Sequence, residues 1–453
     1  MVKPDRILLR SSPSEDTSPE MGLLLGHALA MDYKRVVIAR DLMKSSTMMK
    51  EALVAGLTSS GADVIDLGCT SAPVAAMMAK NGDCAVYITE YREYGLISGY
   101  LLMNSNGSLF RKDQIRHLDK IFTEKQELPD YRHLGNVRTY NFATEEYNRI
   151  LLSMLKAPAG SSVVLDCNCG VSSDSAPQIL NGMGADVISI NAQRDRNFIT
   201  RPMNMTETEH REIRQFVESD PGTIGITLNR VGTLVKIMDE KGNIIDSEKV
   251  LALIVLFLKP KRMVVPADMT SLVEDAFWGR IDVGMITPFE EPSAEERQFI
   301  RVPMDAGSVC EAVANNNADI GFYEGGVIFG NISMMSDGIY TSAVVAQMSA
   351  ENSLYRMCED MPEYHHDSKP FRFECTKDEF SRMFGEKLSA MKYENIQHTD
   401  GWRVEMDGGW FMVTFDGDND QNVIVQAEST DRAYLIGLME IAGDMVSECS
   451  MGQ

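Results

Sequence analysis

Three short groups of residues have the chemistry of metal ligands. Residues 167–169 read Cys-Asn-Cys, residues 365–367 read His-His-Asp, and residues 416–420 read Asp-Gly-Asp-Asn-Asp. A zinc site needs a second cysteine pair or spaced histidines, and a calcium loop needs glycine at its sixth position and glutamate at its twelfth. The chain has no second close cysteine pair, and Gln421 and Ala427 occupy the two calcium-loop positions. The better interpretations are therefore a buried thiol pair for residues 167–169, a solvated linker for residues 365–367 and a solvated acidic turn for residues 416–420.

The charge of the chain restricts its ligands. The 453 residues include 43 Lys+Arg and 66 Asp+Glu, which gives a formal net charge of -23. Such a field repels nucleic acid and anionic lipid, so neither is expected as a partner. A phosphorylated metabolite would need a cleft in which the sign of the charge is reversed. The eight scattered cysteines and the lack of an apolar leader or membrane span predict a cytoplasmic protein with free thiols.

Strand and helix patterns alternate along most of the chain. Residues 35–40 and 62–68 are short apolar runs, and the stretch between them has apolar positions at helical spacing. This order recurs after residue 161 and again after residue 249, which predicts βαβ units with mostly parallel sheets. The last part has the alternating pattern of an antiparallel sheet. The expected domains are 1–150, 151–250 and 251–362, all α/β, and 363–453, which is α+β.

Several stretches resemble the α-D-phosphohexomutases, the family of phosphoglucomutase and phosphomannomutase. They are TSPEMGLLLGHALA, VVIARDLMKSSTMMKEALVAGLTSSGADVIDLG, GITLNRVGTLVKIMDEKGNII and GGVIFGNISMMSDGIYTSAVV, and the resemblance covers essentially the whole chain. It implies three serial α/β domains with mixed, mostly parallel sheets and a C-terminal α+β domain. It also implies an activity, in which a phosphoserine gives its phosphoryl group to a hexose phosphate and is later rephosphorylated. Magnesium and basic groups neutralise the transferring charge.

The loop that carries the family's phosphoserine is altered in this chain. The family reads roughly T-A-S-H-N-P, and residues 89–94 read Thr-Glu-Tyr-Arg-Glu-Tyr. Tyr91 takes the serine position, Arg92 that of the histidine, and Leu101 that of a lysine. A tyrosine hydroxyl lies several ångströms farther from its backbone, and a displacement of about 1 Å is costly in such a transfer. We therefore expect no intact catalytic residue here.

The family's magnesium loop, D-G-D-A-D-R, is altered as well. Residues 229–234 read Asn-Arg-Val-Gly-Thr-Leu, so the ligand positions are Asn229, Val231 and Thr233. No carboxylate remains for a cation that demands hard oxygen ligands, and Arg230 adds a positive charge. We expect no cofactor, and magnesium only if the protein is an active enzyme.

The two substrate-binding loops of the family have changed too. Residues 321–326 read Gly-Phe-Tyr-Glu-Gly-Gly, and Glu324 is the one candidate to bind sugar hydroxyls. The phosphate loop corresponds to residues 414–420, where the family's arginine is absent. Its binding positions are Thr414, Asp416, Gly417 and Asp418. Like charges at such spacing cost about 1–4 kcal/mol, so we expect no phosphate to bind there.

The joint loss of four motifs on a retained scaffold favours a pseudoenzyme that binds, regulates or scaffolds. Basic groups are mostly lost from the loops, with Arg92 and Arg230 as exceptions. The alternative is an active phosphosugar mutase of carbohydrate metabolism with relocated groups, for which Arg92, Arg230 and Glu324 are candidates. A sugar sensor without turnover is a third hypothesis. As partners we expect a second copy, an active mutase, or a sugar ligand.

Overall fold

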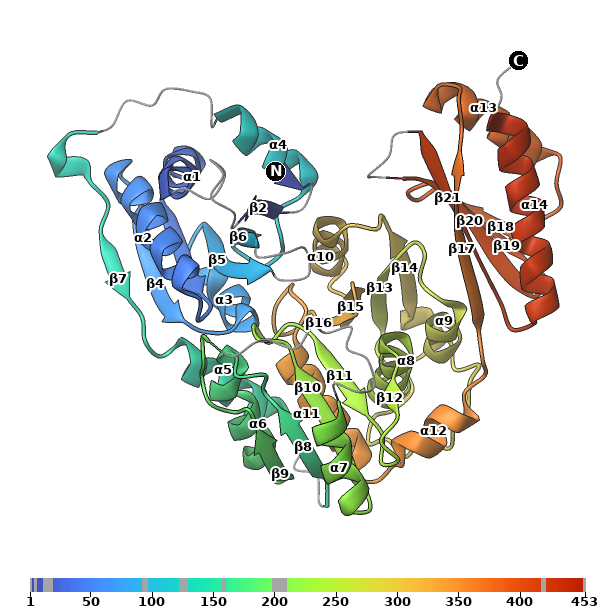
Figure 1. Ribbon diagram of the computed structural model, residues 1–453, viewed down its shortest axis with the longest axis horizontal. Helices are drawn as coiled ribbons and strands as arrows, with labels where there is room; N and C mark the ends of the chain where they lie inside the picture. The colour runs from blue at the N-terminus through green and yellow to red at the C-terminus, as the bar shows by residue number, and fades with distance from the viewer. Residues whose placement is uncertain are drawn as a thin grey trace.

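The computed structural model describes residues 2–3, 6–10, 19–91, 97–121, 129–155, 160–197, 210–416 and 421–450. Within them the chain forms four sheets, of seven, five, four and five strands. We call these sheets with their helices the first to fourth units. Figure 1 shows the first unit on the left and the fourth on the right, with the second and third between them. The predicted fold class is confirmed.

The first unit has the strand order β1-β2-β6-β5-β3-β4-β7. Its strands are β1 (Val2–Lys3), β2 (Arg6–Arg10), β3 (Arg35–Arg40), β4 (Asp63–Cys69), β5 (Cys84–Tyr91), β6 (Ile97–Asn104) and β7 (Val137–Thr139). Its helices are α1 (Pro19–Asp32), α2 (Lys44–Ser59), α3 (Ala72–Met78) and α4 (Lys112–Ile121). Strand β3 runs parallel to β4 and β5, and β4 runs parallel to β7. Their C-terminal ends therefore meet at one edge of the sheet.

The central strands of the first unit are covered on both faces. Val36 packs in one cluster with α1 and α2, and Val37 packs in another with α3, as the unbroken apolar run of β3 requires. Helices α1 and α2 approach closely at Gly56, where a Cβ atom would lie 2.1 Å from the carbonyl oxygen of Leu23. A glycine is therefore required at that contact.

The second and third units repeat the α/β arrangement with smaller sheets. The second has β8 (Ser162–Asp166), β9 (Asp186–Ile190), β10 (Thr223–Leu228), β11 (Val235–Met238) and β12 (Ile244–Ile245), with α5 (Ala143–Met154), α6 (Ala176–Gly182) and α7 (Arg211–Ser219). The third has β13 (Arg262–Pro266), β14 (Gln298–Val302), β15 (Ile320–Tyr323) and β16 (Gly326–Phe329), with α8 (Ser247–Leu258), α9 (Ser271–Phe277), α10 (Ala306–Asn315), α11 (Gly338–Ser349) and α12 (Leu354–Asp360). One apolar cluster runs through the first three units. They therefore share a core.

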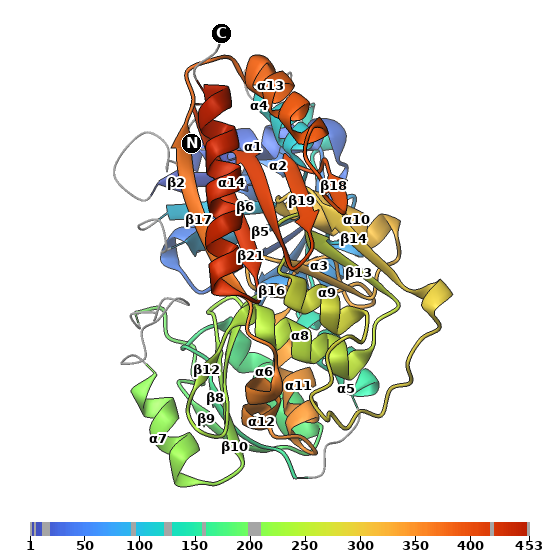
Figure 2. The same ribbon diagram turned by 90° about the vertical axis from the view of Figure 1, so that its right-hand side faces the viewer.

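The fourth unit has a core of its own. Its antiparallel sheet contains β17 (His365–Arg372), β18 (Asn395–Gln397), β19 (Trp402–Met406), β20 (Gly409–Phe415) and β21 (Asn422–Ser429). Figure 2 shows α14 (Arg432–Ser450) along the outer face of this sheet, with α13 (Lys377–Ser389) nearby. Aromatic side chains such as Phe380 and Phe411 fill the space between the helices and the sheet. The domain boundaries predicted from the sequence stay predictions.

One segment differs from its prediction. His365 and His366, interpreted as part of a solvated linker, lie in strand β17 and pair with Ser429 and Glu428 of β21. Strand β17 is the last strand on its side of the sheet, where polar residues are tolerated because one side faces solvent. Within the described ranges, none of the helices combines the length and hydropathy that crossing a bilayer requires.

Candidate functional site

The first candidate loop follows β5 at the C-terminal edge of the first sheet. Tyr91 is the last residue of β5, and its backbone pairs with Ile97 of β6. Arg92 lies outside the described residues, so the roles of Tyr91 and Arg92 stay predictions. At the same edge, the buried carboxylate of Asp41 accepts a hydrogen bond of 2.9 Å from the hydroxyl of Thr89. This buried pair joins the ends of β3 and β5, from which the loop departs.

The loop between β10 and β11 has internal hydrogen bonds where the family has metal ligands. Asn229 Oδ1 accepts from the backbone N–H groups of Thr233 and Leu234 at 2.8 and 3.2 Å. Asn229 Nδ2 donates to Thr233 Oγ1 at 2.8 Å, and Val231 packs against the core. Because Mg²⁺ requires several hard oxygen ligands at about 2.0–2.1 Å, these residues do not fit it. No cluster of three His, Cys, Asp or Glu residues in the described ranges could hold a metal ion.

Glu324 lies at the tip of the hairpin that joins β15 and β16. Glu324 and Gly325 have φ values of 45° and 79°, and Tyr323 pairs directly with Gly326. Two residues with positive φ form the type I′ turn that two-residue hairpins favour. The side chain of Glu324 is exposed and accepts a hydrogen bond of 3.0 Å from the hydroxyl of Tyr323. Sugar binding by Glu324 stays a prediction.

The fourth candidate loop begins later than the sequence predicts. Thr414 lies inside β20, where it pairs with Ile424 and is 4% exposed. The strand extends to Phe415, and its residues 410–414 are all buried. Asp416 is half-buried, and its N–H donates to the carbonyl oxygen of Asn422 at 2.9 Å. The remaining positions of this loop, including Gly417 and Asp418, lie outside the described residues.

Three arginines gather around Cys69 at the C-terminal edge of the first sheet. Arg40 is the last residue of β3, whereas Arg194 and Arg196 follow β9 in the second unit. Arg194 donates to the carbonyl oxygen of Cys69 at 3.3 Å. Burial raises the pKa of the Cys69 thiol, and Arg194, Arg40 and Arg196 each counteract that rise. All three guanidinium groups are therefore within electrostatic range of one sulfur atom.

A fourth arginine joins this group from residues 229–234, the altered magnesium loop, which we call the metal loop. Arg230 Nη2 donates to the carbonyl oxygen of Asp195 at 3.0 Å, and Asp195 stands between two of the arginines in the sequence. One of them, Arg194, is also paired with Asp174. The expected loss of basic groups is thus incomplete. We call residues 40, 194, 196 and 230 the arginine cluster. It lies at the carboxyl ends of parallel strands, where α/β sheets bind ligands.

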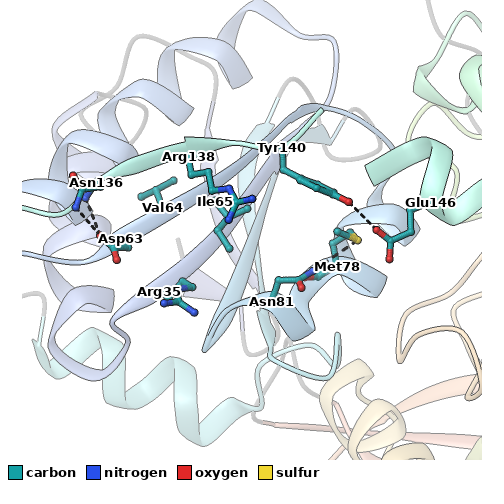
Figure 3. A pocket seen from close by; sticks show the side chains of 10 residues that line it. All are labelled: Arg35, Asp63, Val64, Ile65, Met78, Asn81, Asn136, Arg138, Tyr140 and Glu146. Carbon is teal, nitrogen blue, oxygen red and sulfur yellow. Dashed lines mark hydrogen bonds between the residues drawn. The ribbon is translucent and has the colours of Figure 1, made fainter. Parts of the chain in front are cut away.

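A pocket opens at the opposite edge of the first sheet. It has a volume of about 550 Å³ and lies at the N-terminal ends of β3, β4 and β7, beside the end of α3 (Figure 3). Two arginines, Arg35 and Arg138, line it together with polar and apolar side chains. None of the candidate loops predicted from the sequence contributes to this lining.

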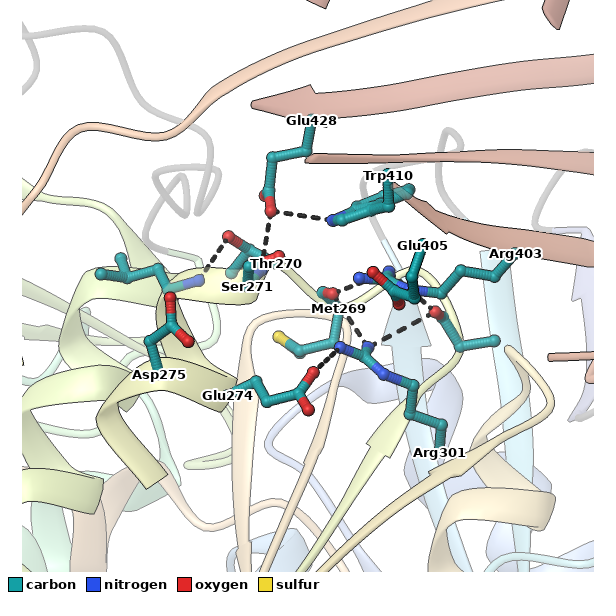
Figure 4. A network of polar contacts seen from close by, with 12 residues as sticks. Met269, Thr270, Ser271, Glu274, Asp275, Arg301, Arg403, Glu405, Trp410 and Glu428 are labelled. Carbon is teal, nitrogen blue, oxygen red and sulfur yellow. Dashed lines mark hydrogen bonds and ion pairs between the residues drawn. The ribbon is translucent and has the colours of Figure 1, made fainter. Parts of the chain in front are cut away.

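The fourth unit is attached to the third through a buried arginine of β19. Arg403 is 1% exposed and donates to the carbonyl oxygens of Ala267 and Met269 at 3.1 and 3.0 Å. Its guanidinium carbon lies 3.7 Å from the centroid of the Trp410 ring. Arg301 of β14 donates to the same Met269 carbonyl at 2.9 Å. Figure 4 shows the two arginines on either side of this carbonyl.

A carboxylate completes the contact between the third and fourth units. Glu428 of β21 is 2% exposed, and its Oε1 atom accepts hydrogen bonds from Trp410 Nε1 at 2.9 Å and from the N–H of Ser271 at 2.7 Å (Figure 4). Ser271 is the first residue of α9, where a negative charge is favoured by the helix dipole. These contacts set the position of the fourth candidate loop relative to the third unit.

Comparison with known proteins identifies the scaffold. Residues 10–129 match the family model described as phosphoglucomutase/phosphomannomutase, alpha/beta/alpha domain I. The protein belongs to the α-D-phosphohexomutase superfamily. A Methanococcoides burtonii protein named "Probable phosphoglucosamine mutase" is 27% identical to this phosphohexomutase homologue over 430 residues, which cover 94% of each chain.

Solved structures show the same fold. A phosphoglucomutase/phosphomannomutase family protein from Burkholderia thailandensis has a TM-score of 0.78 at 16% identity, covering 99% of this chain and 98% of that one. An Aspergillus fumigatus N-acetylphosphoglucosamine mutase, in complex with GlcNAc-6P and magnesium, has a TM-score of 0.50 at 14% identity, covering 92% of this chain and 78% of that one. At these identities the likeness concerns the fold, and the bound ligands belong to that protein.

Proposed function

We propose that this phosphohexomutase homologue binds a hexosamine phosphate at the arginine cluster and does not carry out magnesium-dependent phosphoryl transfer. The observation that carries the proposal is that four arginines from two units meet beside a metal loop that lacks cation ligands. Guanidinium groups bind phosphate with two parallel hydrogen bonds. The sugar class comes from the relatives, whose printed names are phosphoglucosamine mutases.

Turnover is a second candidate function, and the comparisons favour it over a loss of catalysis. Relatives named phosphoglucosamine mutase align with nearly the whole chain, including one from Methanocaldococcus jannaschii that is 23% identical over 96% of both proteins. In this form the chain is a phosphosugar mutase that works without the serine and the aspartates of the family. Arg92, Arg230 and Glu324 are its candidate groups. A second copy or an active mutase remains the proposed protein partner.

Binding is tested by titrating the purified chain with glucosamine 6-phosphate, in calorimetry and in thermal unfolding. A ligand at about 100 times its Kd stabilises the folded state by about 2.7 kcal/mol, so the melting midpoint should rise. Arg40→Gln and Arg196→Gln are expected to weaken binding at least tenfold. Arg211→Gln, which changes an exposed arginine at the start of α7, is the matched control and should bind like the wild type.

Turnover is tested by following glucosamine 1-phosphate formation at high enzyme concentration. Product above a blank without protein would select the second function and refute the first. Alanine at Arg92, Arg230 and Glu324 should then abolish product formation. Activity that survives all three substitutions would contradict a role for these groups. If neither binding nor turnover is detected, both functions are refuted.

The metal loop has a test of its own. The triple substitution Asn229→Asp, Val231→Asp, Thr233→Asp supplies three carboxylates at the ligand positions. Added magnesium should then raise the melting midpoint of the variant, and it should leave that of the wild type unchanged. A comparable rise in the wild type would show that its loop binds the cation after all.

A further inference from the structure

We propose that the pocket at the N-terminal ends of β3, β4 and β7 binds a small organic anion. Its phosphate or carboxylate group lies between Arg35 and Arg138, and its apolar body lies over Ile65 and Met78. Strand β5 has eight residues and ends at Tyr91, so at about 3.3 Å per residue about 25 Å separates this pocket from the opposite edge of the sheet. The site is therefore distinct from the arginine cluster.

The register of the sheet brings the two arginines to one face. Arg35 stands opposite Asp63 in the parallel pair of β3 and β4, and Arg138 stands opposite Ile65 in the pair of β4 and β7. Residues two apart in a strand share a face, so all four side chains lie on the same side, as Figure 3 shows. Two strand spacings of about 4.8 Å and two rises of about 3.3 Å place the arginine Cα atoms about 12 Å apart. Two extended arginine side chains can reach one anion across that distance.

Arg35 and Arg138 form no direct ion pair within the described part of the chain. Neither guanidinium makes a hydrogen bond or an ion pair with a described residue. The two carboxylates of the pocket accept hydrogen bonds from neutral neighbours in its lining, Asp63 Oδ1 from the N–H of Asn136 at 2.9 Å and Glu146 Oε2 from the hydroxyl of Tyr140 at 2.9 Å. In a chain of net charge -23, two arginines without partners in one pocket indicate an anionic ligand.

The size and lining of the pocket indicate an anion with an apolar body. Its volume of about 550 Å³ is in the range of about 300–1,000 Å³ typical of small-molecule sites. Met78 is 3% exposed, Ile65 is half-buried, and both belong to the apolar cluster beside the pocket. The half-buried ring of Tyr140 adds an aromatic surface. An inorganic ion alone would leave this apolar surface uncovered.

Phenyl phosphate is the first probe, because it joins a phosphate to an apolar ring and lacks sugar hydroxyls. Benzoate, inorganic phosphate and phenol are titrated alongside it by calorimetry. Phenyl phosphate or benzoate should bind, and the stronger of the two identifies the preferred anionic group. Inorganic phosphate and phenol should bind at least tenfold more weakly. Absence of phenyl phosphate and benzoate binding up to about 10 mM would overturn the proposal.

Variants locate the binding. Arg35→Gln and Arg138→Gln should each weaken phenyl phosphate binding at least tenfold, whereas Arg211→Gln should bind it like the wild type. Arg40→Gln, which is expected to weaken glucosamine 6-phosphate binding at the arginine cluster, should leave phenyl phosphate binding unchanged. The two proposals thus succeed or fail independently. Binding that is unaffected by both pocket substitutions would place the ligand elsewhere and refute this site.

A measurement on the wild type does not depend on the folding of variants. Phenylglyoxal modifies accessible arginines, and peptide mass spectrometry shows which ones react. Saturating phenyl phosphate should protect Arg35 and Arg138 from modification and should leave the reaction of Arg211 unchanged. Equal protection of all three arginines, or of none, would contradict binding in the pocket.

Discussion

Replacing Arg403 by alanine is expected to loosen the fourth unit from the third. The guanidinium of Arg403 donates to the carbonyl oxygens of Ala267 and Met269, pairs with Glu405 at 2.6 Å and stacks on Trp410. All these contacts are lost together, whereas the apolar core of the fourth unit is left intact. The two carbonyl contacts cross to the third unit, whereas those with Glu405 and Trp410 lie within the fourth, so the substitution weakens both the attachment and the adjoining part of the sheet.

The expected cost follows from the contacts. Two hydrogen bonds contribute about 1 kcal/mol each and a desolvated cation–π contact about 2 kcal/mol, whereas the carboxylate of Glu405 is partly exposed and can be solvated when its partner is removed. Two effects reduce the loss. First, burial and the neighbouring Arg301 lower the pKa of Arg403 to about 10, which means that keeping this charge buried already destabilises the folded state. Second, Arg301 still donates to the carbonyl oxygen of Met269 in the variant. We therefore expect a loss of about 3 kcal/mol in the free energy of unfolding.

Urea denaturation followed by tryptophan fluorescence measures this loss, because Trp402 and Trp410 both lie in the fourth unit. Calorimetry should show a separate, earlier transition for this unit. Arg382→Ala is the matched control, since it breaks an exposed pair with Glu386 on α13 and should cost no more than about 0.5 kcal/mol. A loss below about 1 kcal/mol for Arg403→Ala, or one equal to the control, would refute the reasoning.

Two further predictions concern the core. Gly56→Ala should lower the free energy of unfolding by more than about 2 kcal/mol, because the new Cβ atom would overlap the Leu23 carbonyl. Gly385→Ala, in open space on α13, is the control and should raise it by about 0.5–1 kcal/mol. Urea denaturation that ranks the two variants in the opposite order would contradict the close approach of α1 and α2. Burial raises the pKa of Asp337 from 3.8 to about 6, so the folded state binds this proton more tightly than the unfolded state does. The free energy of unfolding should therefore fall by up to about 3 kcal/mol as pH rises from about 4 to 6. If Asp337→Asn shows the same dependence on pH, this carboxylate is not its cause.

Local patterns made most of the fold predictable. The apolar run at residues 35–40 coincides with β3, and the amphipathic stretch that follows it corresponds to α2. Such patterns work because burial on both faces of a parallel strand requires continuous apolar residues. Strand β17 was missed because an edge strand with alternating exposure contains charged residues and Pro370, which resemble a linker.

The candidate site was predictable only where its residues are neighbours in the sequence. The metal loop could be judged from residues 229–234 alone, because its ligands would come from one turn. The arginine cluster could not, because it brings together arginines from β3, from the segment after β9 and from the metal loop. The same holds for Arg403, whose partners Ala267 and Met269 lie in another unit. Contacts between units leave no local pattern in the sequence.

The metal loop also constrains how any turnover could work. A loop of alternating aspartates needs a cation to offset their mutual repulsion, whereas here Asn229 and Thr233 hold the turn together by hydrogen bonds. Charge on a transferring phosphoryl group would then be neutralised by arginine alone. Activity should therefore withstand EDTA and should fall as salt screens the arginine cluster, with a Debye length of about 10 Å at 0.1 M salt. Complete inhibition by EDTA that magnesium reverses would show that a cation acts in the cleft, and the loop of residues 229–234 would not explain it.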